Sequence, residues 1–163
     1  MGRRVFFSFH FDEDAWRASQ VRNMGAIESD EPVSPNDWEA VKRAGNSAIE
    51  YWIDQQMGGR TCAVVLVGAQ TANRPWVQYE IKKAWNDGLG VVGIRIHGLK
   101  NNDQHVSIRG ANPFDLFNIN GTSLSQIVKL YDPPGFDSKT IYSEIRTNLE
   151  ALVEDAIRIR SRY

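Results

Sequence analysis

Short apolar blocks and longer amphipathic blocks follow one another along the chain, and this order predicts alternating strands and helices. Apolar runs at residues 5–9, 61–67 and 91–96 have the length of strands. The middle run, Thr-Cys-Ala-Val-Val-Leu-Val, shows no alternation with polar residues. A strand of that kind is typical of a parallel sheet covered on both faces, so we expect these runs to form the centre of such a sheet.

Helical patterns separate and follow the strands. Residues 14–24 have helical character, and Ser-Pro-Asn-Asp at residues 34–37 has the form of a helix start, with a Ser N-cap and proline at the first helical position. This start predicts a helix over 34–57. A further helix is expected over 75–87, and spaced apolar residues predict an amphipathic terminal helix over 141–159.

The remaining segments carry weaker signals. We expect a short strand around Ala26-Ile27, an irregular stretch over 98–123 with a tight turn at Asn120-Gly121, and a last strand over 127–131. Strand–helix order in 163 residues predicts one domain over 1–163, of the doubly wound α/β class with a mainly parallel sheet flanked by helices.

Ligands of such folds bind outside the carboxyl ends of the strands, and this rule selects the loops at residues 10–13, 68–74 and 96–100. The loop 68–74 is rich in hydrogen-bonding groups that suit a ribose or phosphate, including Gln70 and Asn73. Capping of the next helix explains the same composition equally well.

The helix after that loop opens with Trp76-Val77-Gln78-Tyr79-Glu80, in which the Trp and the Glu lie four residues apart on one helical face. A carboxylate there can perform acid–base chemistry or stabilise a cation, and the ring offers a surface for a sugar or base. Any amphipathic helix can produce such a pair, so spacing alone leaves Glu80 open as an ordinary exposed residue.

Composition narrows the class of protein. Net charge is −1, which argues against a nucleic-acid partner, and no apolar run approaches the roughly 18 residues of a membrane span. The single cysteine, Cys62, lies in an apolar run and is expected to be a core residue in a reducing compartment. No signal peptide precedes the first strand, so we expect a cytoplasmic protein.

Three other motifs do not fit their usual functions. Gly88 to Gly93 match GxGxxG but follow a helix and open a strand, the reverse of a dinucleotide fingerprint. Asp12 and Glu13 resemble a receiver-domain acidic pair, yet the central strand ends in Val67-Gly68 where that class needs Asp. The three histidines, His10, His97 and His105, are scattered without ligand spacing, so no metal site is expected.

The first strand, Val-Phe-Phe-Ser-Phe-His-Phe-Asp at residues 5–12, resembles the first box of TIR domains. Residues 64–71 with Trp76 to Glu80 resemble the TIR strand and the Trp-x-x-x-Glu helix behind it. Together with Asn-Pro-Phe-Asp at 112–115, they resemble the TIR-like group of the Thoeris anti-phage systems. The resemblance covers about residues 4–118, and it leaves the strand and helix of 120–160 less certain.

This resemblance implies an enzyme that splits NAD at the nicotinamide–ribose bond and releases a cyclic ADP-ribose-type signal, with NAD as substrate and no other cofactor. Glu80 matches the catalytic glutamate of the family. By the same match, Phe6, Ser8 and His10 would line the ribose or nicotinamide side, and Trp76 would support the helix that presents Glu80. The product would act on a separate effector protein, and self-association into a homo-oligomer is expected for activity.

Two departures from the family pattern are visible: a Phe-Trp pair near the C-terminus is absent, and Val77 replaces a small residue after the Trp. TIR folds also include scaffolds without turnover. A non-catalytic interaction module is therefore the alternative function. A third is a nucleotide-binding domain that acts on another N-glycosidic substrate through Glu80.

Overall fold

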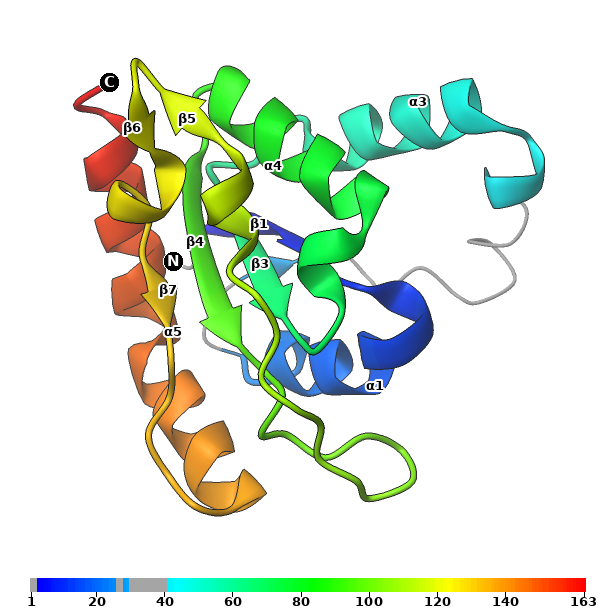
Figure 1. Cartoon of the computed structure of the whole chain (residues 1–163), viewed down its shortest axis with the longest axis vertical. Helices are drawn as coiled ribbons and strands as arrows, with labels where there is room; N and C mark the ends of the chain where they lie inside the picture. The colour runs from blue at the N-terminus through cyan, green and yellow to red at the C-terminus, as the bar shows by residue number, and fades with distance from the viewer. Residues whose placement is uncertain (1–2, 26–27, 30–40) are drawn as a thin grey trace.

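A computed structural model of the chain describes residues 3–25, 28–29 and 41–163. Its centre is a five-stranded, wholly parallel sheet (Figure 1). The strands lie in the order β2 (Glu28–Ser29), β1 (Arg4–Ser8), β3 (Cys62–Val67), β4 (Gly90–Arg95) and β7 (Leu130–Tyr131). The predicted α/β class with a doubly wound parallel sheet is confirmed.

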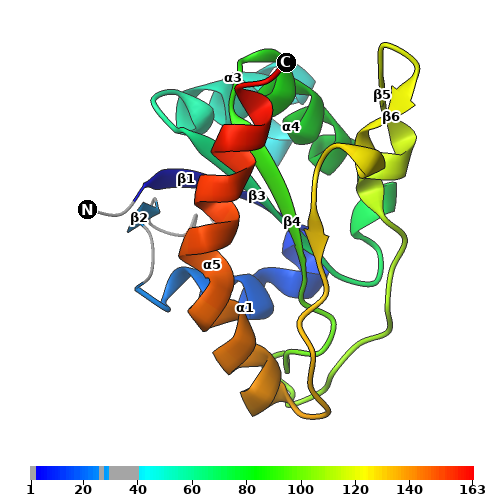
Figure 2. The same ribbon diagram turned by 90° about the vertical axis from the view of Figure 1, so that its left-hand side faces the viewer.

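Helices cover both faces of this sheet (Figures 1 and 2). Helices α1 (Phe11–Arg22) and α5 (Ser138–Arg160) pack on one face, and α3 (Asn46–Met57) and α4 (Pro75–Asn86) pack on the other. Alternate residues of β3 pack against opposite helical layers. Val64 packs on the side of α1 and α5, and Val65 packs on the side of α3 and α4. Every residue of β3 is consequently buried, as its unbroken apolar sequence predicts.

Most element ends fall close to their expected positions. The first helix is longer than expected because it begins at Phe11, directly after the first strand. The last strand is shorter than the expected 127–131, since the amides of Ile127 and Val128 bond back to Leu124 of a 3-10 turn, η3 (Leu124–Gln126), and β7 starts only at Leu130. The helix α5 begins earlier than its apolar pattern, with the Asp137 carboxylate accepting a hydrogen bond from the Thr140 amide.

The expected single helix over 34–57 is wrong in its described part. Residues 41–43 are helical, the chain then breaks at Ala44 and Gly45, and α3 starts anew at Asn46. Gly45 has φ of 96°, a conformation that glycine adopts readily and that no helix contains. The proposed helix start at 34–37 and the proposed strand at Ala26-Ile27 lie outside the described residues.

The long segment after β4 contains a 3-10 turn, η2 (Pro113–Leu116), and a small hairpin of β5 (Asn118–Ile119) and β6 (Thr122–Ser123). Asn120 and Gly121 form the tight turn that the sequence predicts, with φ of 52° and 86°. In the part of the chain that the structure describes, no helix is long and apolar enough to cross a membrane.

The closest approach between the sheet and α5 depends on Gly90. A Cβ at this position would lie 2.7 Å from the backbone nitrogen of Ile157, so Gly90→Ala would push strand and helix apart. We expect this substitution to lower the free energy of unfolding by about 1–3 kcal/mol, measured by urea denaturation. Gly58→Ala is the matched control, because its nearest contact would be an ordinary 3.5 Å. If the two variants were equally stable, the close packing of β4 against α5 at Gly90 would be contradicted.

Candidate active site

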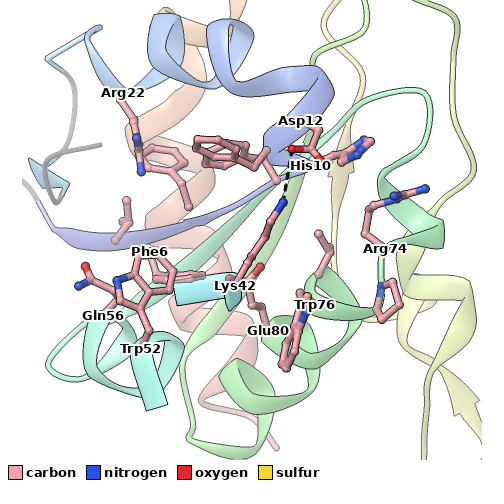
Figure 3. A pocket seen from close by; sticks show the side chains of 16 residues that line it. Phe6, His10, Asp12, Arg22, Lys42, Trp52, Gln56, Arg74, Trp76 and Glu80 are labelled. Atoms are coloured by element: carbon pink, nitrogen blue, oxygen red, sulfur yellow. Dashed lines mark ion pairs between the residues drawn. The ribbon is translucent and has the colours of Figure 1, made fainter. Parts of the chain in front are cut away.

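A pocket lies between β1 and β3, where the strand order reverses. The strand β2 lies on one side of β1, and the later strands β3, β4 and β7 lie on the other. The helix α1 follows β1 on one face, whereas α4 follows β3 on the other, and the residues after both strands meet there (Figure 3). This is the place at which doubly wound folds bind ligands. The lining is rich in aromatic rings, namely Phe6, Phe7, Phe9, Phe11, Trp52 and Trp76.

Glu80 is the buried carboxyl group of this pocket. It lies about one and a half turns into α4, and only 8% of the residue is exposed. The Ser8 hydroxyl, at the end of β1, donates a 2.7 Å hydrogen bond to Oε1 of Glu80. Burial raises the pKa of Glu80 to about 8, and the bond from Ser8 opposes that rise by favouring the ionised form. With a pKa of about 8, the carboxyl group of Glu80 is mostly protonated at neutral pH.

Trp76 lines the same pocket as Glu80, which confirms that the two share a helical face. Its ring meets Tyr79 edge-on at a centroid distance of 5.6 Å, and the Tyr79 hydroxyl donates to Asp54 of α3. The position of Trp76 is thus tied to both α3 and α4. A held ring of this kind offers a flat surface to a bound sugar or base.

Phe6 and His10 also line the pocket, whereas Ser8 reaches it through its bond to Glu80. Nδ1 of His10 lies 3.3 Å from a carboxylate oxygen of Glu13, one turn along α1. Five of the seven residues predicted from the sequence are therefore gathered around one cavity: Phe6, Ser8, His10, Trp76 and Glu80.

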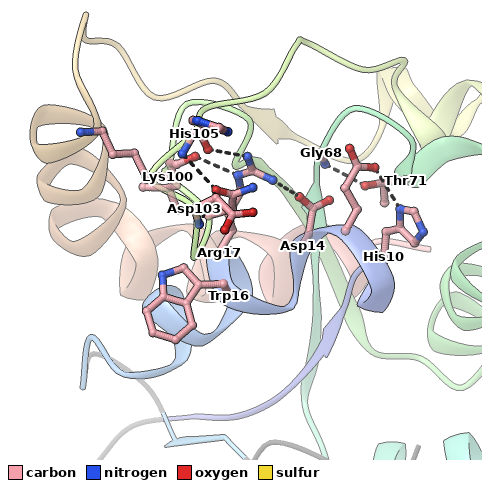
Figure 4. Close-up of polar contacts among 12 residues, drawn as sticks. His10, Asp14, Trp16, Arg17, Gly68, Thr71, Lys100, Asp103 and His105 are labelled. Atoms are coloured by element: carbon pink, nitrogen blue, oxygen red, sulfur yellow. Dashed lines mark hydrogen bonds and ion pairs between the residues drawn. The ribbon is translucent and has the colours of Figure 1, made fainter. Parts of the chain in front are cut away.

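Gln70 and Asn73 are not brought to this pocket. Both are exposed and neither lines it, because the loop folds into a 3-10 turn, η1 (Thr71–Asn73), that satisfies its own polar groups. The Thr71 hydroxyl accepts from the Gly68 amide at 2.7 Å (Figure 4). The Gln78 side chain donates to the Ala72 carbonyl. The N-cap of α4 is Arg74, whose side chain makes no capping hydrogen bond, so helix capping by a side chain does not explain the polar composition of the loop either.

Two arginines of the pocket were not found from the sequence. Arg74 precedes Pro75 of α4, and Arg22 ends α1 with its guanidinium 5.4 Å from the centre of the Phe9 ring. Within the described residues, the buried Nε atoms of both have no hydrogen-bond partner. Burial lowers the pKa of Arg22. A lone arginine at a helix end carries no local pattern that separates a pocket residue from a solvated one.

The remaining candidates lie elsewhere. Cys62 is fully buried in β3, and burial raises the pKa of its thiol to about 12, which confirms a core residue. No group of three or more His, Cys, Asp or Glu side chains suitable for a metal ion occurs in the described ranges.

Two comparisons relate this chain to known proteins. Residues 6–101 match the family model described as Thoeris protein ThsB, TIR-like domain, and this range includes Ser8, His10 and Glu80. A curated relative from Bacillus cereus (strain MSX-D12) bears the name "Putative cyclic ADP-D-ribose synthase ThsB1". It is 32% identical over 140 residues, which cover 83% of this chain and 73% of the relative.

The burial of Glu80 predicts a pH-dependent cost in stability. The folded protein retains the Glu80 proton up to a pKa of about 8, whereas the ordinary value of 4.5 holds in the unfolded chain. Stability is consequently lost as pH rises through this window. We expect Glu80→Gln to melt on the order of 5 °C above the wild type at pH 9, with the difference vanishing near pH 5.

Glu150→Gln provides the control, since Glu150 is exposed on α5 and does not line the pocket. Its melting temperature should follow the wild type across the same pH range. A Glu80→Gln variant that melts below the wild type at pH 9 would show that the ionised carboxylate stabilises the fold.

Proposed function

Because this chain belongs to the Thoeris ThsB family of TIR-like domains, we propose that it is an enzyme that cleaves the nicotinamide–ribose bond of NAD and forms a cyclic ADP-ribose-type nucleotide. The observation that carries the proposal is a single one: a buried carboxyl group, Glu80, fixed by Ser8 in an aromatic pocket. NAD is the substrate, and the chain's own residues supply the chemistry.

Cleavage breaks the bond between C1′ of the ribose and the pyridinium nitrogen. Nicotinamide leaves with the bonding electron pair, and positive charge develops on the ribose as an oxocarbenium-like species. An ionised Glu80 beside that ribose would stabilise the charge, much as a carboxylate does in glycoside hydrolysis. Poor access of water to Glu80 strengthens this interaction, since the local dielectric constant is low.

The raised pKa of Glu80 suits this role. The nicotinamide ring of NAD carries a positive charge, and a nearby cation favours the ionised form of a carboxyl group. Substrate binding would therefore release the Glu80 proton, and the hydrogen bond from Ser8 would hold the resulting carboxylate in place. Ser8 acts in this scheme on Glu80, as a positioning residue.

Cyclisation requires that a hydroxyl oxygen or ring nitrogen of the same ADP-ribose attacks C1′ in place of water. The apolar side chains of Phe6, Phe9 and Val77 on the pocket wall support this outcome, because they offer no hydrogen bond to a water molecule. Where the attacking group is a hydroxyl, its proton must leave. A carboxylate with a pKa of about 8 is a competent base for that transfer.

The rest of the dinucleotide would extend toward an arginine at one end of the pocket. The cavity volume of about 220 Å³ is below the roughly 300–1,000 Å³ usual for ligand sites. It therefore suits the nicotinamide–ribose end, with Phe6, His10 and Trp76 around the sugar and ring. Arg22 and Arg74 lie at opposite ends of the pocket (Figure 3), so the guanidinium at one end would meet the negatively charged pyrophosphate.

The same proposal implies a biological role for the nucleotide product. The nucleotide product would act as a signal in anti-phage defence in the cytoplasm, read by a separate effector protein. Self-association into a homo-oligomer would complete the site. The alternative is a non-catalytic interaction module, in which Glu80 would have no chemical task.

Product analysis with NAD tests the proposal. Wild-type protein, alone and in lysate from phage-infected cells, should release nicotinamide and a cyclic ADP-ribose isomer identified by chromatography and mass spectrometry. Glu80→Gln should reduce turnover by about 100-fold or more while the exposed control Glu150→Gln retains it. Linear ADP-ribose as the main product would indicate a hydrolase. Absence of turnover in every condition, with folded protein, would favour the interaction module.

The pH dependence of the reaction tests the partnership between Ser8 and Glu80. The ratio kcat/KM should rise with pH and level off near pH 8, because the free enzyme must lose the Glu80 proton. Ser8→Ala removes the hydrogen bond that favours the carboxylate, so its rising limb should move to higher pH, with about a tenfold loss at pH 7.

Ser19→Ala is the matched control, because the Ser19 hydroxyl donates only to the Trp16 carbonyl within α1 and does not line the pocket. Its pH profile should match that of the wild type. A uniform loss at all pH values in Ser8→Ala would instead mean that Ser8 does not act through the ionisation of Glu80.

A further inference from the structure

A second cavity lies beyond the carboxyl end of β4, next to the start of α5. Arg95 and His97 enter it from β4 and the residues that follow, and Asp132, Gly135 and Ile141 enter it from the chain around β7 and α5. It shares no lining residue with the pocket around Glu80. We call it the β4 cavity.

Arg95 is the central group of the β4 cavity, and within the described residues its charge is buried without a direct ion pair. Only 7% of the residue is exposed, and its Nη1 donates a 2.7 Å hydrogen bond to the neutral carbonyl of Gly110. Among the described residues, no carboxylate forms an ion pair with it. Burial lowers the pKa of Arg95, the neighbouring Arg109 lowers it further, and the carboxylate of Asp132 opposes this only in part. A buried charge in this state is unfavourable unless something neutralises it.

Two further donors stand beside Arg95. Nδ1 of His97 is buried and has no hydrogen-bond partner within the described part of the chain. Arg109 is exposed and donates to the carboxylate of Asp132, the acidic residue of the cavity wall. Two guanidinium groups and an imidazole therefore face a single carboxylate, and that carboxylate is already engaged.

We propose that the β4 cavity binds the phosphoryl group of a small molecule through Arg95, His97 and Arg109. A guanidinium presents paired N–H donors that match phosphate oxygens, and a tetrahedral phosphoryl group accepts hydrogen bonds from several directions at once. Free phosphate and the phosphates of a nucleotide share this chemistry. The site is separate from the Glu80 pocket, so it does not depend on the function proposed above.

Anchoring of the loop at Gly110 does not by itself explain Arg95. A neutral side chain could donate one hydrogen bond to the Gly110 carbonyl without a buried charge. Nor does it explain the unpartnered Nδ1 of His97, since a structural histidine normally satisfies its ring nitrogens when buried. An anion between Arg95 and His97 accounts for both observations.

Titration of the full-length protein with inorganic phosphate, followed by ¹⁵N NMR, tests the proposal. The amides of Gly98 and Gly135 and the ring nitrogens of His97 should shift together and saturate. Arg109→Gln and Arg95→Gln should each weaken binding by about tenfold or more. Arg109 has 60% of its side chain exposed, so its variant is expected to fold even where Arg95→Gln does not.

Asp132→Asn gives the sharpest comparison, because it removes the one negative charge of the cavity. It should tighten phosphate binding by about two- to fivefold. If the cations of the β4 cavity only held the loop in place, Asp132→Asn would not tighten phosphate binding. Arg74→Gln, which alters the Glu80 pocket alone, should leave the Gly98 and Gly135 shifts unchanged.

A parallel titration with ADP separates the two sources of the phosphoryl group. Tighter binding of ADP at the same resonances would identify a nucleotide site, and equal affinity would identify a site for free phosphate. Absence of saturable shifts with either probe in folded wild-type protein would overturn the proposal. So would shifts that persist undiminished in both Arg109→Gln and Arg95→Gln.

Discussion

The complete burial of β3 is the constraint from which the rest of the structure follows. All six of its residues are buried between β1 and β4, so helices must cover both faces of the sheet. The chain therefore sends α1 to one face after β1 and α4 to the other after β3. The crevice between them is a consequence of that divergence, and it sets Ser8 at the end of β1 against Glu80 of α4.

Burial of Glu80 beside Ser8 lowers the stability of the fold, and the same burial favours the proposed chemistry. A carboxyl group with 8% exposure and one hydrogen bond is poorly compensated, which is why its pKa rises to about 8. The same burial keeps water from the group and places its ionisation within the physiological range. A more polar pocket would make the fold more stable and the carboxylate weaker, both as a base and as a stabiliser of positive charge.

Sequence patterns predicted the structural features that depend on residues close together along the chain. The strands were visible because burial on both faces leaves an unbroken apolar run, and Glu80 was visible through its helical spacing from Trp76. The break at Gly45 was missed because helical spacing continues across it. Gln70 and Asn73 were assigned to the ligand because backbone hydrogen bonds within their loop have no sequence signature. Arg22, Arg74 and Arg95 depend on tertiary neighbours, which spacing does not reveal.

The buried charges of this molecule are of two kinds: those that are paired within the protein and those that face a cavity. Arg17 is as buried as Arg95, yet its guanidinium is fully engaged by Asp14 and by the carbonyls of Leu99 and His105. This fold therefore provides counter-ions where a charge holds loops together. Among the residues that the structure describes, neither Glu80 nor Arg95 forms an ion pair, and each faces a cavity of its own. The proposed ligands would be of opposite sign: a cationic ring or ribose beside Glu80, and a phosphoryl group beside Arg95.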